Sequence, residues 1–141
     1  MDLDAHWQAM YDALRAGLDT AGLTDVPLAA IHSQDSQTAG EALVPPYVIY
    51  SGERETGTGT TGSGQNKVAL SGWRVTCRAR DLDEVLAMAS AVTAKMEQED
   101  IDQTADGYVT TAVELVGGQT LYEIDSKLNS YLLRFNWERS K

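Results

Sequence analysis

Three glycines near the middle of the chain match a nucleotide-binding pattern. In the stretch GTGTTGSG, Gly57, Gly59 and Gly62 have the spacing G-x-G-x-x-G. That pattern binds a dinucleotide where a strand ends in the glycine turn and a helix begins, because the helix N-terminus holds the pyrophosphate. Here a strand-like segment follows, and Gly64 precedes glutamine instead of the lysine of a P-loop. We therefore expect no nucleotide site and no cofactor.

Groups that could carry out catalysis are few. His6 and His32 are the only histidines, and Cys77, the only cysteine, lies on the apolar side of an expected strand, where a thiol behaves as a small hydrophobic group. The motifs G-x-S-x-G, H-E-x-x-H and C-x-x-C are missing. Folding could still bring together any two of the 21 acids. We expect no enzymatic activity.

A run of acids, EQEDIDQTADG (residues 97–107), could in principle bind a metal. It holds Glu97, Glu99, Asp100 and Asp102 but lacks the D-x-D-x-D-G order of a calcium loop. We expect a solvated loop and no metal site.

The chain is strongly acidic. Its 141 residues suit one domain, its formal net charge is -10, and Arg15 is the only base among the first fifty residues. Such a charge disfavours general binding to nucleic acids and to anionic membranes, which repel it. The sequence contains no run of about 18 apolar residues, so no transmembrane helix is expected. The chain starts with acidic residues, whereas a signal peptide starts with basic ones. We expect a soluble protein made in the cytoplasm.

Arginines gather on one side of a predicted strand, KVALSGWRVTCRAR (residues 67–80). From about residue 73 it alternates between an apolar face and a face that carries Arg74, Arg78 and Arg80. Two interpretations stay open. The arginines could pair across strands with acids such as Glu114 or Glu123, which stabilises little on an exposed face. Alternatively, they could form an interface with an acidic subunit surface.

The elements that must position these groups follow from periodicity. Apolar residues at helical spacing predict amphipathic helices over 3–21, ended by Gly22, and over 82–97, capped by Asp81 with Glu84 three residues on. Strands are predicted over 27–33, 46–53, 67–80, 108–116, 119–125 (after a Gly117-Gly118 hairpin) and 131–138. The order α-β-β-β-α-β-β-β predicts one α+β domain: a mostly antiparallel sheet with both helices packed on it.

The glycine run now has a structural interpretation. RETGTGTTGSGQN (residues 54–66) is too long for a tight hairpin, and its composition predicts a long, flexible, Gly/Thr-rich hairpin arm. An arm of this kind suits an assembly subunit, because it can reach a neighbour or the next ring of a stack. The candidate contact residues are Arg54, Glu55, Gly57, Thr58, Gly59, Thr60, Thr61, Gly62 and Gly64.

This order of elements resembles the tail terminator, or tail-completion, proteins of long-tailed bacteriophages. The resemblance rests on PYVIY after a polar loop, on the strand-to-helix segment WRVTCRARDLDEVLAMASAVTAKM, and on LYEID before YLLRFNWE, and it covers roughly residues 5 to 138. It is one of pattern and order. The chain departs from the family in its glycine-rich arm and its acidic excess.

The resemblance implies a structural virion protein without catalytic chemistry, spanning residues 1–141 as one terminator-like domain. Such proteins form a homo-hexameric ring that caps the tail tube, stops its growth and provides the surface for head docking. The implied partners are copies of the chain, the tail tube protein and a head-tail connector protein. The implied location is the head-proximal end of the virion tail, and DNA could pass through the ring lumen without sequence-specific contacts.

Two alternatives stay open. The chain could be a head-completion or connector protein between portal and tail, because size and fold class overlap with those of a terminator. It could also be a small hydrolase or ligand-binding domain whose acids act as bases or metal ligands.

Overall fold

The computed structural model describes residues 3–30, 44–60, 67–97, 104–105, 108–124 and 127–140. Its elements are α1 (Leu3–Thr20), β1 (Leu28–Ala30), β2 (Tyr47–Thr60), β3 (Lys67–Ala79), α3 (Leu82–Met96), β4 (Thr104–Ala105), β5 (Tyr108–Glu123) and β6 (Leu128–Ser140). The predicted α+β class and the order α-β-β-β-α-β-β-β are confirmed.

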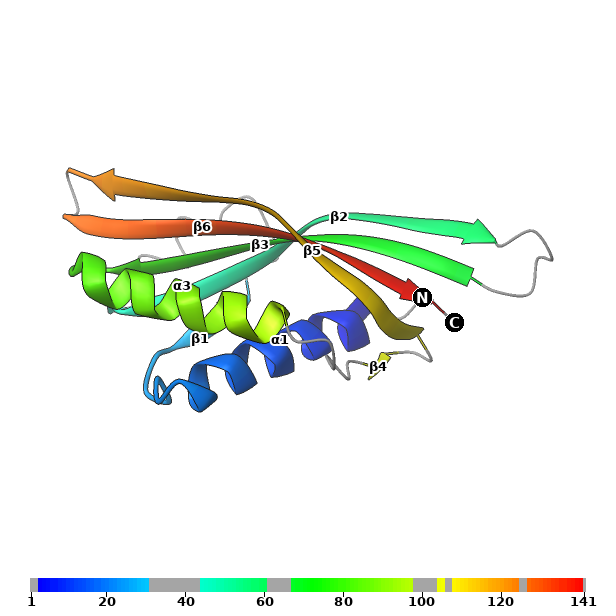
Figure 1. Ribbon diagram of the computed structural model, residues 1–141, viewed down its shortest axis with the longest axis horizontal. Coiled ribbons are helices and arrows are strands. Elements are labelled where there is room, and N and C mark those ends of the chain that lie inside the picture. Colours follow the sequence, from blue (N-terminus) through cyan, green and yellow to red (C-terminus); the bar gives the residue numbers. More distant parts are fainter. Residues whose placement is uncertain are drawn as a thin grey trace.

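One six-stranded sheet, with the strand order β1-β2-β3-β6-β5-β4, forms the body of the molecule. All neighbouring strands are antiparallel except β1 and β2, which are parallel. Figure 1 shows α1 and α3 on the same side of this sheet, while the β2–β3 end reaches past the helices. The sheet therefore has a half with a helix layer and a half that extends beyond it.

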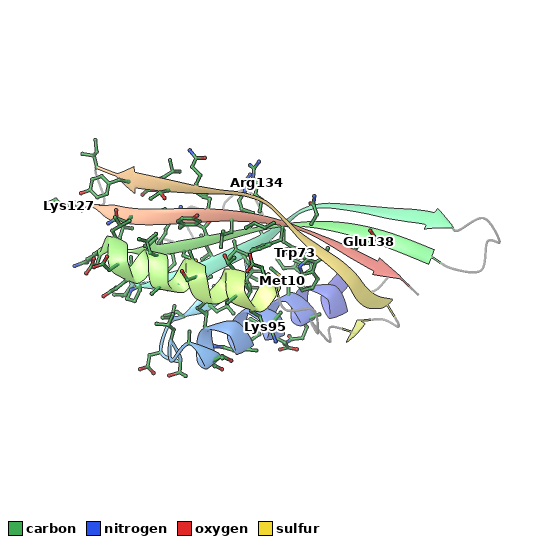
Figure 2. The ribbon with its side chains drawn as sticks, viewed as in Figure 1. Met10, Trp73, Lys95, Lys127, Arg134 and Glu138 are labelled. Atoms are coloured by element: carbon green, nitrogen blue, oxygen red, sulfur yellow. The ribbon has the colours of Figure 1, made fainter. Side chains whose placement is uncertain are left out.

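The core lies between the sheet and the helices. The apolar parity of β3 is confirmed, because Trp73, Val75, Cys77 and Ala79 are each at most 1% exposed. They pack with β6 residues such as Phe135 and with helix residues that recur at three- and four-residue spacing; on α1 these are Met10, Ala13, Leu14 and Leu18. In Figure 2 the labelled Met10 and Trp73 lie in this layer. Apolar residues that recur every two positions in the strands thus pack against apolar residues that recur about every 3.6 positions in the helices.

Both helix ends follow their sequence signals. Gly22 has a φ of +81°, and the N–H groups of Gly22 and Leu23 donate to the carbonyls of Asp19 and Leu18, as in a glycine-terminated helix end. At the start of α3, Asp81 Oδ1 accepts from the N–H of Asp83 at 3.1 Å. α1 therefore ends, and α3 begins, where the capping residues of the sequence predict.

Arg15, the lone base of the acidic N-terminal region, is a structural residue. Its guanidinium donates to the carbonyl oxygens of Val26 (2.7 Å) and Leu23 (2.9 Å), and it also pairs with Asp19 at 3.0 Å. It therefore ties the connection after α1 to the helix.

The predicted hairpin at Gly117-Gly118 is wrong. β5 continues through both glycines, and its residues on either side, from Val109 to Glu123, pair with β6 from Ser140 to Leu128. The register shifts between Leu115 and Gly117, so the first glycine marks a bulge. The strand predicted over 119–125 is therefore the second half of β5. The number of strands still agrees with the prediction because the short strand β4 was not predicted.

The two helices approach each other closely at Gly17. A Cβ on Gly17 would lie 2.8 Å from Lys95 Cβ, an atom that cannot rotate away. Gly17→Ala would gain about 1 kcal/mol of helix propensity but cost about 1–3 kcal/mol of overpacking. We expect a net loss of about 1 kcal/mol in the free energy of unfolding, measured by urea denaturation. Gly117→Ala, whose Cβ meets nothing within 4 Å, is the control; a stabilised Gly17→Ala variant would contradict the close approach.

Candidate interface surfaces

The first part of the glycine run, up to Thr60, belongs to the sheet. Arg54–Thr60 continue β2 and pair with β3 down to Lys67, so Arg54, Glu55, Gly57, Thr58, Gly59 and Thr60 lie on a paired strand, while Thr61, Gly62 and Gly64 lie outside the described residues. The β2 register shifts between Gly57 and Gly59, which explains glycines there as bulge residues. The next element that the structure describes is strand β3, whereas the dinucleotide pattern leads into a helix.

Of the predicted basic face, Arg78 is engaged within the chain. Its Nη1 donates to the Tyr47 hydroxyl at 3.3 Å, and its Nη2 lies 3.8 Å from Glu123 of β5. This is the cross-strand pairing that was one of the two interpretations. The Glu123 side chain is 49% exposed, so the ion pair is screened and contributes little stability.

Arg74 and Arg80 occupy different surroundings. Arg80 follows the end of β3, and its carbonyl accepts from Asn129 Nδ2 at 3.0 Å. Arg74 lies directly opposite Arg134 of β6, which in Figure 2 projects from the sheet on the side away from the helices. The structure thus adds Arg134 to this face. Its parity was visible in the sequence, but its place beside β3 depends on a pairing between strands about 60 residues apart in the chain.

The sheet face away from the helices has its own buried residues. Tyr47 (2% exposed) and Ile49 (7%) form a small cluster with Ala29, and Ser130 is 2% exposed. Ser130 pairs with Arg78 in the register, and Ser130 Oγ and Arg78 Nε are buried without a hydrogen-bond partner in the structure. Part of this face is therefore enclosed, and its accessible part lies toward β6 and β5.

The second half of strand β5 is exposed. Leu115 and all residues from Gly117 to Glu123 are exposed, and the large apolar side chains Leu115, Leu121 and Tyr122 are 41%, 43% and 58% exposed. Within the described chain, β4 pairs only with Tyr108 and Val109, so the outer edge of β5 from Thr110 to Glu123 has no strand beside it. The sequence carries no signal for this surface, because its alternation looks like that of any half-buried strand.

A groove of about 360 Å³ runs along α3 on the side facing β5. Leu86, Ser90, Thr93 and Glu97 of α3 line it together with Tyr131 of β6. The Tyr131 ring lies close over Gly118 of β5, where a Cβ would be 2.9 Å from its hydroxyl. Tyr131 therefore borders the groove and also lies against β5 at Gly118.

The described residues offer no metal-binding cluster. Among them, no group of three or more His, Cys, Asp or Glu side chains could hold a metal. The His6 side chain is not described, and His32, Glu99, Asp100 and Asp102 lie outside the described ranges. Within those ranges no helix is long and apolar enough to cross a membrane.

Two buried ionisable groups of the core, a thiol and a phenol, have strongly raised pKa values. Burial raises the pKa of the Cys77 thiol to about 12. Burial, with smaller contributions from Tyr11 and Asp12, raises the pKa of Tyr50 to about 12. Because the thiolate is the reactive form, Cys77 is chemically protected in the folded chain.

These shifts predict a loss of stability in alkali. Each group stays protonated in the folded state but ionises in the unfolded state, from about pH 9 for the thiol and about pH 10 for the phenol. The folded state then binds more protons, so the free energy of unfolding should fall as the pH rises from about 9 to about 12. Urea denaturation at a series of pH values measures this fall. Cys77→Ala should remove the part that begins near pH 9; an unchanged slope would contradict the assignment.

The geometry of these surfaces can now be set beside known proteins. No protein-family model and no curated protein matches the sequence. Among solved structures, the chain is similar to a chain of the virion of a native gene transfer agent particle, with a TM-score of 0.58 and 14% sequence identity, covering 98% of this chain and 93% of that one. At this identity the likeness shows that the fold is shared over nearly the whole length.

Proposed function

We propose that this protein is a structural subunit of a phage-like virion, and more specifically a tail terminator. The observation that carries the proposal is the shared fold with a virion chain over 98% of the length. A shared fold alone does not determine function, so the proposal also depends on the exposed surfaces.

The exposed surfaces suit an assembly subunit. Within the described chain, β5 has an uncovered edge and exposed apolar side chains, and the β2–β3 end extends past the helix layer. Both features are typical of surfaces on which other copies or partners pack. The β2–β3 end is a candidate contact with the tail tube protein, and it includes the arm residues Arg54–Thr60.

In this proposal the chain forms a homo-hexameric ring on the finished tail tube. The ring stops growth of the tube and offers its other side to a head-tail connector protein. It acts by binding and needs no catalytic residues or cofactor. The location is the head-proximal end of the tail.

Electron microscopy of particles made with a stop codon at Trp7 tests the role. We expect filled heads without tails beside tails of abnormal length, and restoration when the intact chain is supplied in trans. Tails of normal length beside leaking or empty heads would place the protein on the head side as a connector. Normal infectious particles would contradict any structural role in the virion.

A further inference from the structure

The sheet has two long edges that no strand covers within the described chain. Among the described residues, β1 pairs with Val48, Ile49 and Tyr50 of β2, and none pairs with the outer edge of β2 from Ser51 to Thr60. On the opposite side, β5 is open from Thr110 to Glu123. Every second residue of each edge turns its N–H and C=O outward, which makes such an edge a template for another strand.

The two edges have compatible directions. β2, β3, β6 and β5 alternate in direction, so β5 runs antiparallel to β2. A rotation about an axis roughly parallel to the strands keeps their directions, so β2 of a second copy placed in this way beside β5 of the first runs antiparallel to it. The ten open residues of β2 span roughly 34 Å, which is shorter than the open part of β5.

The composition of β5 also favours a covered edge. Natural proteins protect open edges with lysine, proline or short strands. β5 has a bulge at Gly117, but it is 16 residues long, contains neither lysine nor proline, and exposes Leu115, Leu121 and Tyr122. A strand paired with β5 would cover these side chains and lie beside the groove along α3.

From this arrangement we infer that the outer edge of β5 (Thr110–Glu123) binds the β2 edge (Ser51–Thr60) of a second copy, which joins the sheets of neighbouring subunits. The contact uses two different surfaces, so it repeats from copy to copy and closes into a ring where the rotation between neighbours closes, whereas pairing of β5 with β5 would stop at a dimer. The inference rests on the proposed ring, and it names the strands that build it.

A matched pair of substitutions tests the β5 side. Leu121 on β5 and Leu82 on α3 are both 43% exposed, so Leu121→Lys and Leu82→Lys make the same change at equal exposure. In sedimentation velocity over a concentration series, we expect wild type and Leu82→Lys to assemble, and Leu121→Lys to need at least tenfold more protein. Equal assembly of both variants, or a wild type that stays monomeric at several hundred micromolar, would overturn the inference.

Cross-linking then identifies the two edges. Chains carrying Thr56→Cys are mixed with chains carrying Thr120→Cys and treated with a short bis-maleimide; buried Cys77 gives little background. We expect cross-linked pairs in the mixture and none from either chain alone. Pairs from Thr120→Cys alone would show β5–β5 contact, and rings without cross-links would overturn the strand assignment while leaving the ring itself. Cross-links combined with normal virions in the stop-codon experiment would overturn the terminator role alone.

Discussion

A chain in which residues 61–66 are replaced by Asn-Gly is expected to keep its melting temperature but fail to end tail tubes. Thr60 and Lys67 are register partners, so a two-residue turn joins them without disturbing the paired parts of β2 and β3. The replacement removes the tip of the arm and leaves the core intact. If the tip contacts the tube, affinity for isolated tubes should fall at least tenfold, and tails should exceed their normal length.

The matched control keeps the length of the arm. Replacing residues 61–66 by six alternating glycines and serines preserves reach and changes only the side chains. If this control docks normally while the Asn-Gly chain fails, reach is what matters; if both fail, the side chains at the tip make the contact. Unchanged docking of the Asn-Gly chain would contradict a role for residues 61–66 in tube binding.

Trp73→Ala is expected to have the largest effect on stability. Trp73 is 1% exposed, and its ring centroid lies 5.2 Å from that of Trp7, 6.3 Å from Tyr50 and 6.2 Å from Trp137. Truncating such a residue costs about 3–5 kcal/mol through lost burial and the cavity left behind. Because a domain has only about 5–15 kcal/mol in total, the variant should unfold at much lower urea concentration, as followed by circular dichroism.

Trp73→Phe separates the ring from the indole nitrogen. Trp73 Nε1 is buried without a hydrogen-bond partner in the structure. Phenylalanine keeps an aromatic ring in the cluster and removes this unsatisfied donor, so we expect a loss of only about 1 kcal/mol. A loss as large as that of the alanine variant would mean that the indole nitrogen or the full ring size is needed.

The sequence predicted correctly those helices and strands whose signals lie within a few residues of each other. The strand over 67–80 and the helix from 82 are confirmed as β3 and α3, because alternation and the Asp81 cap act within a few residues. Gly117 and Gly118 misled the prediction, because a glycine pair favours a turn only when nothing else holds the chain extended. In the fold, β6 pairs with β5 on both sides of these glycines.

The candidate surfaces were harder to predict for the same reason. Arg134 joins the face of Arg74 only once β6 lies beside β3, and β5 becomes an exposed strand only because β4 is two residues long. Neither fact has a signal within a sequence window. The arm was placed correctly between two strands, but its first half, Arg54–Thr60, extends β2, because β3 offers partners down to Lys67.

The partial helix layer has a consequence for hydrogen exchange. In Figure 1 the helices lie along one half of the sheet, although the strands are continuous through both. Amide protons of core residues such as Val75 and Leu133 should exchange only when the whole domain unfolds, whereas those of the open β2 and β5 edges should exchange through small local openings. Docking of a neighbour or a tube would then slow the second set and leave the first unchanged, so exchange could map contacts residue by residue.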